Sequence, residues 1–164
     1  MEISLPPHEV ALRLAAATLI GVLIGVTRDL KSKPTGMRTL ALVCLGAALA
    51  TVATVYLDDL RSDPDALSRT VQGVLQGVLT GIAFLGAGAI IRREDDDHPG
   101  LTTAANVFVT AAIGIACGLG VWWVVFIGAG LALFVLVILH PLEKYLERMT
   151  RKRRRPSSEA DDQT

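Results

Sequence analysis

"LTTAANVFVTAAIGIACGLGVWWVVFIGAGLALFVLVIL", residues 101–139, is a run of 39 amino acids without a single charged side chain. A bilayer core about 30 Å thick is crossed by about 20 helical residues, so this run is long enough for two crossings. Gly118 and Gly120 lie near its middle and permit the tight reversal that two successive spans require. The stretch therefore predicts a membrane protein.

Three further apolar runs precede this one and reach the length of a membrane span. Residues 71–91 and 40–57 contain no charged side chain, and residues 10–26 contain only Arg13. Because 20% of the whole chain is charged, the charges must be segregated between the apolar runs. We predict an all-α integral membrane bundle of five transmembrane helices, at about residues 10–27, 40–57, 71–91, 101–118 and 120–139.

The distribution of basic residues predicts how the helices are threaded. Thirteen of the 16 Lys and Arg residues fall on one side of the arrangement, in segment 28–39, directly after the third span and in the tail. The other side receives Arg61 and Arg69. Basic residues accumulate in cytoplasmic segments, so the N-terminus should lie outside and the C-terminus in the cytoplasm.

The two ends of the chain differ in charge. Residues 1–9, the expected external N-terminus, contain no Lys or Arg, so the first span should remain in the mature protein and not be cleaved as a signal peptide. Residues 140–164 should form a basic cytoplasmic tail that is largely disordered at its end. The run from Arg151 to Arg155 lies shortly after a span, which favours contact with anionic lipid over nucleic acid.

No arrangement of residues points to catalysis or to a cofactor. The three histidines are scattered, at positions 8, 98 and 140, and position suggests no Ser, His and acid set. Gly86 and Gly88 begin a G-x-G-x-x-G pattern, but Ile91 occupies the third glycine position and the preceding run is too long for a strand. We therefore expect no catalytic residue, no cofactor, and a protein that is not an enzyme.

The loop after the third span carries four consecutive acidic residues, at positions 94–97. Clustered carboxylates could hold Mg²⁺ or Ca²⁺, since hard cations take oxygen ligands. The glycine-spaced ligand geometry of such sites is missing, so a solvated run of charges is the favoured interpretation. No metal site is predicted.

Small residues are expected to bring the helices together, because close packing replaces the hydrophobic effect in lipid. Gly73, Gly77 and Gly81 recur every four residues and form a groove, beside a row made of Gln72, Gln76 and Thr80. We predict that the polar face of the fourth span packs on this groove, with the Asn106 amide bonding across the interface. The predicted packing glycines are Gly21, Gly25, Gly73, Gly77, Gly81, Gly86, Gly88 and Gly114.

The predicted spans contain one charged side chain, Arg13, and two thiols, Cys44 and Cys117. Arg13 is the only formal charge within a span, and it is either a structural anchor at the interface or a functional site, with Glu9 or the acidic residues 58 and 59 as candidate partners. Cys44 and Cys117 are expected about 20 Å apart in membrane depth, which excludes a disulfide between them.

Four motifs occur in a characteristic order along the chain. They are "GVLIGVTRD" at 21–29, "KPTGMRTLALVCLGAAL" at 33–49, "GIAFLGAGAII" at 81–91 and "GLTTAANVFVTAAIG" at 100–114. In these motifs the chain resembles the transmembrane domain of the MgtC/SapB family of bacterial inner-membrane proteins. The resemblance implies a bacterial plasma-membrane protein with five spans. Its implied site residues are Asp29, Arg38, Thr39, Cys44, Thr102, Thr103 and Asn106.

The sequence also departs from the family pattern. Thr27 stands where an acidic residue is usual, Leu40 where His is frequent, and Phe108 where Trp is frequent. The virulence-linked members carry a soluble cytoplasmic domain after the fifth span, and the 25 residues after Leu139 are too few for it. We expect the transmembrane domain alone.

The resemblance implies a function in stress adaptation. Some family members are associated with growth in low Mg²⁺, survival inside macrophages and inhibition of the F-type ATP synthase, and they are not thought to transport Mg²⁺ themselves. We expect a non-enzymatic regulator that contacts another integral membrane complex, with the ATP synthase as a candidate. The alternative is a small ion transporter or channel, working as a homo-oligomer, whose route would be lined by Gln72, Gln76, Thr80, Thr103, Asn106 and Thr110.

Overall fold

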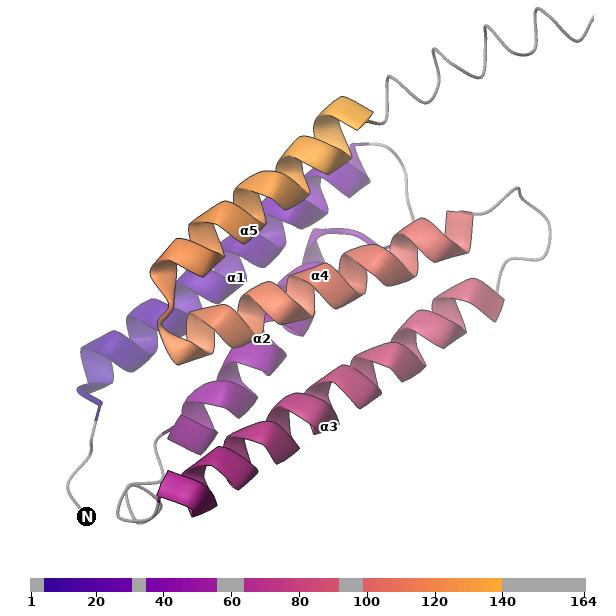
Figure 1. Ribbon diagram of the computed structural model, residues 1–164. Helices are drawn as coiled ribbons and strands as arrows, with labels where there is room; N and C mark the ends of the chain where they lie inside the picture. Colours follow the sequence, from indigo (N-terminus) through magenta and orange to yellow (C-terminus); the bar gives the residue numbers. More distant parts are fainter. Residues whose placement is uncertain (1–4, 31–34, 56–63, 92–98, 140–164) are drawn as a thin grey trace, which may run out of the picture.

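A computed structural model describes residues 5–30, 35–55, 64–91 and 99–139, and within them the chain is helical without a strand (Figure 1). The prediction of an all-α bundle of five helices is confirmed. The fifth helix ends in a π-helical turn. The elements are α1 (Pro7–Asp29), α2 (Met37–Val55), α3 (Pro64–Ile91), α4 (Pro99–Leu119), α5 (Trp122–Phe134) and η2 (Val135–Leu139).

The observed helices begin a few residues before the apolar runs, except for α5. Three of them start at a proline, namely Pro7, Pro64 and Pro99, because proline at the first helical position has no amide hydrogen to leave unsatisfied and has a fixed helical φ. Charge-free runs do not contain this signal, so these helices extend beyond the predicted spans, whose bounds stay a prediction. The predicted reversal between the last two helices is confirmed, since Gly120 adopts a φ of 76°.

The helices have the dimensions of membrane spans. α1, α2, α3 and α4 supply 4 segments that are long and apolar enough to cross a bilayer, and Trp122–Ile138 is a shorter apolar helix. Large apolar side chains point outward from the bundle, for example Phe84 at 80% exposure and Trp123 at 81%. Such a surface suits acyl chains as solvent. The orientation with the N-terminus outside stays a prediction.

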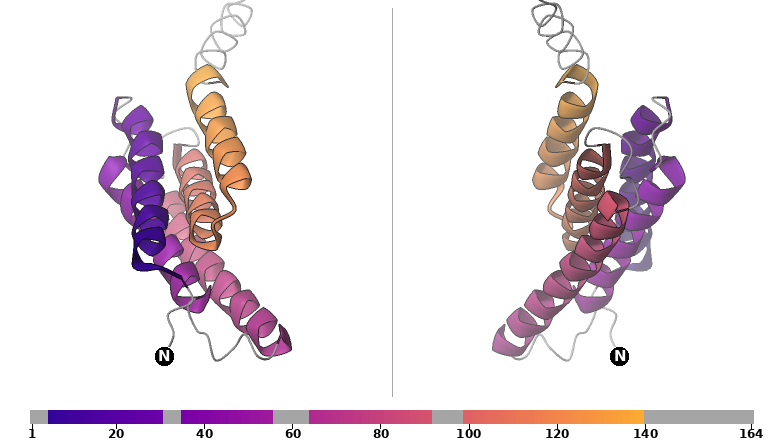
Figure 2. Two further views of the ribbon diagram at one scale, coloured as in Figure 1. Left: turned by 90° about the vertical axis from the view of Figure 1, so that its left-hand side faces the viewer. Right: turned by 90° about the vertical axis from the view of Figure 1, so that its right-hand side faces the viewer.

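α4 lies at the centre of the bundle (Figures 1 and 2). It contacts α2 and α3 most extensively, and α1 packs mainly against α2. Consequently 61% of the α4 span is buried inside the bundle, compared with 11% of the α3 span. α3 is thus the long helix that its own chain covers least.

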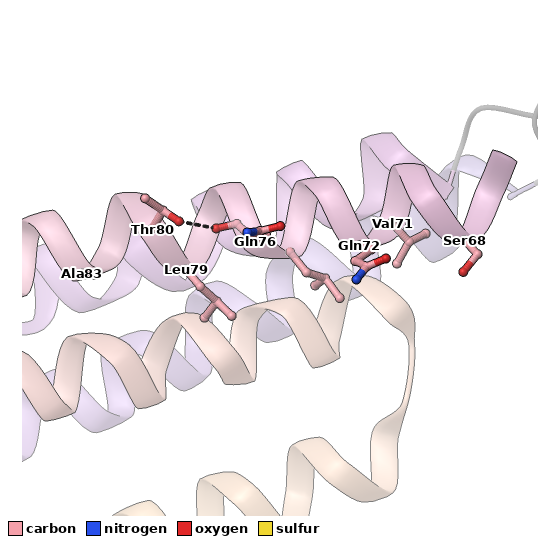
Figure 3. A pocket seen from close by; sticks show the side chains of 8 residues that line it. Ser68, Val71, Gln72, Gln76, Leu79, Thr80 and Ala83 are labelled. Carbon is pink, nitrogen blue, oxygen red and sulfur yellow. Dashed lines mark hydrogen bonds between the residues drawn. The ribbon is translucent and has the colours of Figure 1, made fainter. Parts of the chain in front are cut away.

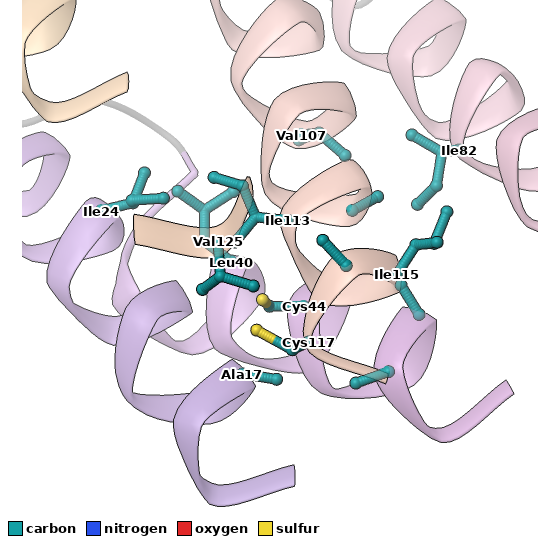
Figure 4. Packing of buried hydrophobic residues seen from close by; sticks show 14 residues of the cluster. Ala17, Ile24, Leu40, Cys44, Ile82, Val107, Ile113, Ile115, Cys117 and Val125 are labelled. Atoms are coloured by element: carbon teal, nitrogen blue, oxygen red, sulfur yellow. The ribbon is translucent and has the colours of Figure 1, made fainter. Parts of the chain in front are cut away.

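The core consists mainly of small side chains, which lets the helix axes approach closely. Ala17, Ala48, Ala111, Cys44 and Cys117 all have 0% exposure. Figure 4 shows Ala17 and the two cysteines among larger residues such as Leu40 and Val125.

Glycines lie at the closest helix contacts. A Cβ added at Gly21 would lie 2.7 Å from Ala41 Cα, and one at Gly118 would lie 2.8 Å from the Ala48 carbonyl oxygen. Gly25 similarly abuts the backbone of Met37. These positions leave no room for a side chain, so α1 meets α2, and α2 meets α4, through backbone contacts.

The predicted packing of α4 on the glycine groove of α3 is wrong. Among the described residues, apart from the adjacent backbone of α3 itself, no atom lies within 4 Å of a Cβ added at Gly73, Gly77 or Gly81. The polar face of α4 is turned elsewhere, since Gly114 abuts the Cys44 carbonyl of α2. The Asn106 amide donates to the Thr102 carbonyl of its own helix at 2.9 Å, not across an interface. The helix that approaches α4 closely at Gly114 is thus α2 and not α3.

The predicted separation of the two cysteines is also wrong. Cys44 and Cys117 belong to one core cluster, and Figure 4 shows their sulfur atoms in the same region. Because Gly114 abuts Cys44, Cys117 lies only about 4.5 Å further along the α4 axis. The prediction assumed that α2 and α4 begin at the same depth, whereas α4 extends about 12 Å further at its N-terminal end. Both thiols are free.

Candidate functional site

Arg28 is the centre of the polar contacts at one end of the bundle, which we call the Arg28 end. It lies in the last turn of α1 and is only 4% exposed. Its Nε donates to the Thr35 carbonyl at 3.1 Å, and its Nη2 donates to Thr103 Oγ1 at 2.8 Å. A buried guanidinium is costly unless it is hydrogen-bonded. These bonds therefore fasten α1 both to the segment before α2 and to α4.

Asp29, the last residue of α1, bonds the first turn of α2 at the same end. Its Oδ2 accepts a hydrogen bond from the Met37 amide at 2.9 Å, which satisfies a free N–H of the first helical turn. The negative charge also interacts favourably with the positive end of the α2 dipole. Gly36 abuts the Asp29 carboxylate so closely that a side chain there would overlap it. Glycine at position 36 therefore leaves the space in which the Asp29 carboxylate reaches the first turn of α2.

The remaining residues predicted from the resemblance are spread over different environments. Thr103 is 3% exposed and belongs with Arg28, Asp29 and Thr35 to the polar group at the Arg28 end, which we call the Arg28 cluster. Arg38, Thr39 and Thr102 are exposed on the first turns of α2 and α4. Asn106 is partly exposed, and Cys44 lies in the core. The structure therefore brings only Asp29 and Thr103 into this cluster.

Sequence reasoning used Arg28 for topology and missed it as a site residue. Residues 13, 17, 21, 24 and 28 are spaced by three or four and share one buried face of α1. A basic residue on the same face as the packing glycines was the available signal for a buried arginine.

Arg13 makes a second polar contact at the opposite end, which we call the Arg13 end. It is 8% exposed, its Nη1 donates to the Gly118 carbonyl at 2.8 Å, and its Nη2 bonds Glu9 Oε1 at 2.5 Å. The Gly118 carbonyl lies in the last turn of α4, where carbonyls lack helical partners and attract positive charge. Glu9 is therefore the acidic partner among the described residues, and residues 58 and 59 lie outside them.

Gly120 is needed at the Arg13 end for a second reason besides its backbone conformation. A Cβ added there would lie 2.6 Å from Arg13 Nη2 and 2.7 Å from Cζ. The turn between α4 and α5 thus lies directly against the guanidinium. This geometry supports the anchor interpretation of Arg13.

Two further predictions concern charged segments. In the part of the chain that the structure describes, no group of three His, Cys, Asp or Glu side chains could hold a metal ion. The acidic loop 94–97 and the basic run 151–155 lie outside that part, so the interpretations of both segments stay predictions.

α3 carries an open groove on its surface (Figure 3). Its volume is about 1020 Å³, and Gln72, Gln76, Leu75 and Leu79 are among its lining residues. Thr80 also lines it, and its Oγ1 donates to the Gln76 carbonyl of the same helix at 2.7 Å. The polar side chains of α3 therefore face outward and not into the bundle.

Residues 14–145 match the model of the MgtC family. The chain belongs to this family. The resemblance read from the four motifs is thereby confirmed, and the Arg28 cluster lies entirely within the matched residues. Family membership and the apolar helices make this MgtC-family chain a multi-pass membrane protein.

Three relatives illustrate how far the likeness extends. Protein SrpB of Synechococcus elongatus is 41% identical over 133 residues, which cover 76% of this chain and 71% of SrpB. YhiD of Escherichia coli strain K12, whose name calls it a candidate magnesium transporter, is 35% identical over 82% of this chain and 62% of its own. Protein MgtC of Salmonella typhimurium is 41% identical over 66% of this chain and 43% of MgtC. No solved structure matches this MgtC-family chain.

Proposed function

We propose that this protein is a non-enzymatic regulator of the bacterial inner membrane that serves adaptation to Mg²⁺ limitation by contacting another integral membrane complex. The link to Mg²⁺ is supported by the family and by the name of YhiD, which is 35% identical. Because this chain spans 43% of MgtC and 62% of YhiD, the activity of the longer relatives is carried over only as part of this proposal.

The location of the polar side chains is the observation that carries the proposal. A transport route needs polar groups that converge around a path through the protein. Here Gln72 and Gln76 lie on the outer surface of α3, while Thr110 is fully buried at 0% exposure. The α4 face that holds Thr110 is closed by the backbone contacts of Gly114 and Gly118 with α2. A protein arranged in this way acts more readily through its surface than through its interior.

α5 provides a surface suited to such a contact. Trp123, Phe126, Ile127, Leu131 and Phe134 recur at helical spacing on one side and are 51–81% exposed. Aromatic side chains supply much of the energy at protein interfaces. We take this α5 face as the docking surface for the partner, with the membrane sector of the F-type ATP synthase as the candidate.

Capture of partners from native membranes tests the proposal. Tagged wild-type protein is purified in mild detergent beside a Phe126→Ala, Phe134→Ala variant, and co-purifying membrane proteins are quantified by mass spectrometry. We expect a membrane complex that is enriched by the wild type and depleted with the variant. Equal recovery by both proteins, or no enriched membrane protein, contradicts the proposal. A deletion strain grown across a Mg²⁺ series, with ATP and membrane potential measured, tests the link to Mg²⁺ limitation.

A small oligomeric transporter or channel is the second candidate function. The observation in its favour is the outward polar row of α3, which could line a route shared between copies of the chain. Flux of Mg²⁺ and H⁺ into liposomes that contain the purified protein discriminates between the two functions. Saturable flux would contradict the regulator proposal and support a transporter.

A further inference from the structure

The described residues of the chain leave most of the α3 surface uncovered. Only 11% of the α3 span is buried, compared with 28% for α1 and 39% for α2. A lipid-facing helix needs no protein cover when its surface is apolar, but α3 carries glycines and amides on the exposed side. The composition of this face therefore calls for a protein neighbour.

The glycines of the bundle provide an internal comparison. In α1 and α4, each of Gly21, Gly25, Gly114 and Gly118 lies against the backbone of another helix. Among the described residues nothing lies within 4 Å of a Cβ added at Gly73, Gly77 or Gly81, and the same holds for Gly46, Gly88 and Gly130. Of these open glycines, only Gly73, Gly77 and Gly81 recur every four residues along one helix. A helical glycine costs about 1 kcal/mol relative to alanine unless close approach requires it. Three such glycines in one row indicate close packing against a helix of another protein chain.

The amide side chains beside this row give a second, independent observation. Gln72 and Gln76 lie in the groove of about 1020 Å³, and within the described residues neither side-chain amide has a hydrogen bond. An unpaired amide in hydrocarbon costs free energy, whereas an interhelical bond satisfies it. These amides need a donor and acceptor surface, which acyl chains do not provide.

The two features lie on different sides of the same helix. Gln72 precedes Gly73 and Gln76 precedes Gly77, so the glutamine row and the glycine row are about 100° apart. One neighbouring helix cannot be centred on both rows. Each row can instead receive a different neighbouring copy of α3. The glycine row of one copy then packs against the glutamine groove of the next.

We propose that copies of this chain assemble through α3, with the glycine row Gly73, Gly77 and Gly81 of one copy seated in the glutamine groove of the next. Glycines leave backbone carbonyls accessible, so the Gln72 and Gln76 amides of the neighbour can donate to them. Both surfaces are uncharged between residues 71 and 91, so no like charges oppose the contact. A contact between unlike faces repeats from copy to copy and gives a ring where the rotation between copies closes. This inference goes beyond the proposed function, because it concerns copies of the chain and not another complex.

The oligomeric state of the full chain tests the assembly. The mass of the purified protein in mild detergent is measured for wild type, for Gly77→Leu and for the matched control Gly130→Leu. A Cβ added at Gly77 or Gly130 meets no described atom within 4 Å, so we expect the single bundle to tolerate both leucines. We expect an oligomer for wild type and Gly130→Leu, and at least about a tenfold weaker association for Gly77→Leu. A monomeric wild type, or an unchanged Gly77→Leu oligomer, would overturn the proposal.

Disulfide crosslinking in native membranes tests the orientation. Chains carrying Gly77→Cys are co-expressed with chains carrying Gln76→Cys and oxidised, while Cys44 and Cys117 are buried and form the unreactive background. We expect a crosslinked dimer from the mixture and little from Gly77→Cys alone. Efficient crosslinking of Gly77→Cys with itself would overturn the head-to-tail contact in favour of a symmetric one. Since the α3 variants leave the α5 face unchanged, loss of assembly and loss of a partner complex are distinguishable.

Discussion

Replacing Thr103 by valine removes one hydroxyl and keeps the shape of the side chain, so it tests the Arg28 contact with little change in packing. Arg28 Nη2 donates to Thr103 Oγ1 at 2.8 Å, and the two residues are 4% and 3% exposed. A hydrogen bond to a charged group contributes about 1.5–3 kcal/mol, and its loss deprives a buried guanidinium of one acceptor. We expect Thr103→Val to lower the free energy of unfolding by about 1.5–3 kcal/mol.

Unfolding in mixed micelles of mild detergent and dodecyl sulfate, followed by circular dichroism, measures this free energy. Thr102→Val is the matched control, because it makes the same chemical change at the adjacent, exposed position and should remain within about 0.5 kcal/mol of wild type. An Arg28→Met variant and the double variant complete a thermodynamic cycle. Because the two residues interact, we expect the double variant to cost less than the sum of the single variants by about 1–2 kcal/mol. Equal stability of Thr103→Val and Thr102→Val would refute the reasoning.

Other contacts lead to predictions of the same kind. Gly114→Ala should destabilise the protein by about 1–3 kcal/mol in the same assay, because the new methyl group forces α4 away from the Cys44 carbonyl. Gly46→Ala, whose Cβ meets nothing within 4 Å, should instead be neutral or slightly stabilising; the reverse order would contradict the packing. Arg13→Ala should expose the loop after α4 to protease in membrane preparations, since the Gly118 carbonyl and the turn lose their contact; unchanged digestion would count against it. Cys44 and Cys117 should resist a water-soluble maleimide until the protein is unfolded, as mass spectrometry can record; labelling in intact membranes would contradict their burial.

The helices were predictable from sequence because the length and hydropathy of a span are local properties. The charge-free run 101–139 alone required two crossings, and Gly120 marked the turn between them. The contacts between helices depend instead on how far each helix is shifted along its neighbour. Neither composition nor spacing contains that shift, so Cys44 and Cys117 were placed about 20 Å apart although both lie in one core cluster.

The candidate site was only partly predictable for a related reason. Asp29 and Thr103 were identified through the family resemblance, and Asp29 bonds the Met37 amide. Thr103 is bonded by Arg28, which the sequence presented as one of many basic residues beside a span. The glycine row of α3 was predicted to receive α4, but among the described residues no helix approaches it, so its use in close packing stays a prediction. A row of small residues indicates that another helix can pack closely there, but it does not indicate which helix.

The two arginine contacts together determine which parts of the molecule are able to move. Along α1 the bonded positions are 13 and 28, and along α4 they are 118 and 103, so each helix has the same separation of about 22 Å between its two fastening points. A shift of α4 along α1 by a single residue would break both bonds at once. We therefore expect α1 and α4 to keep their register, and motion within the bundle to fall on α5 and on α3, whose span is only 11% buried.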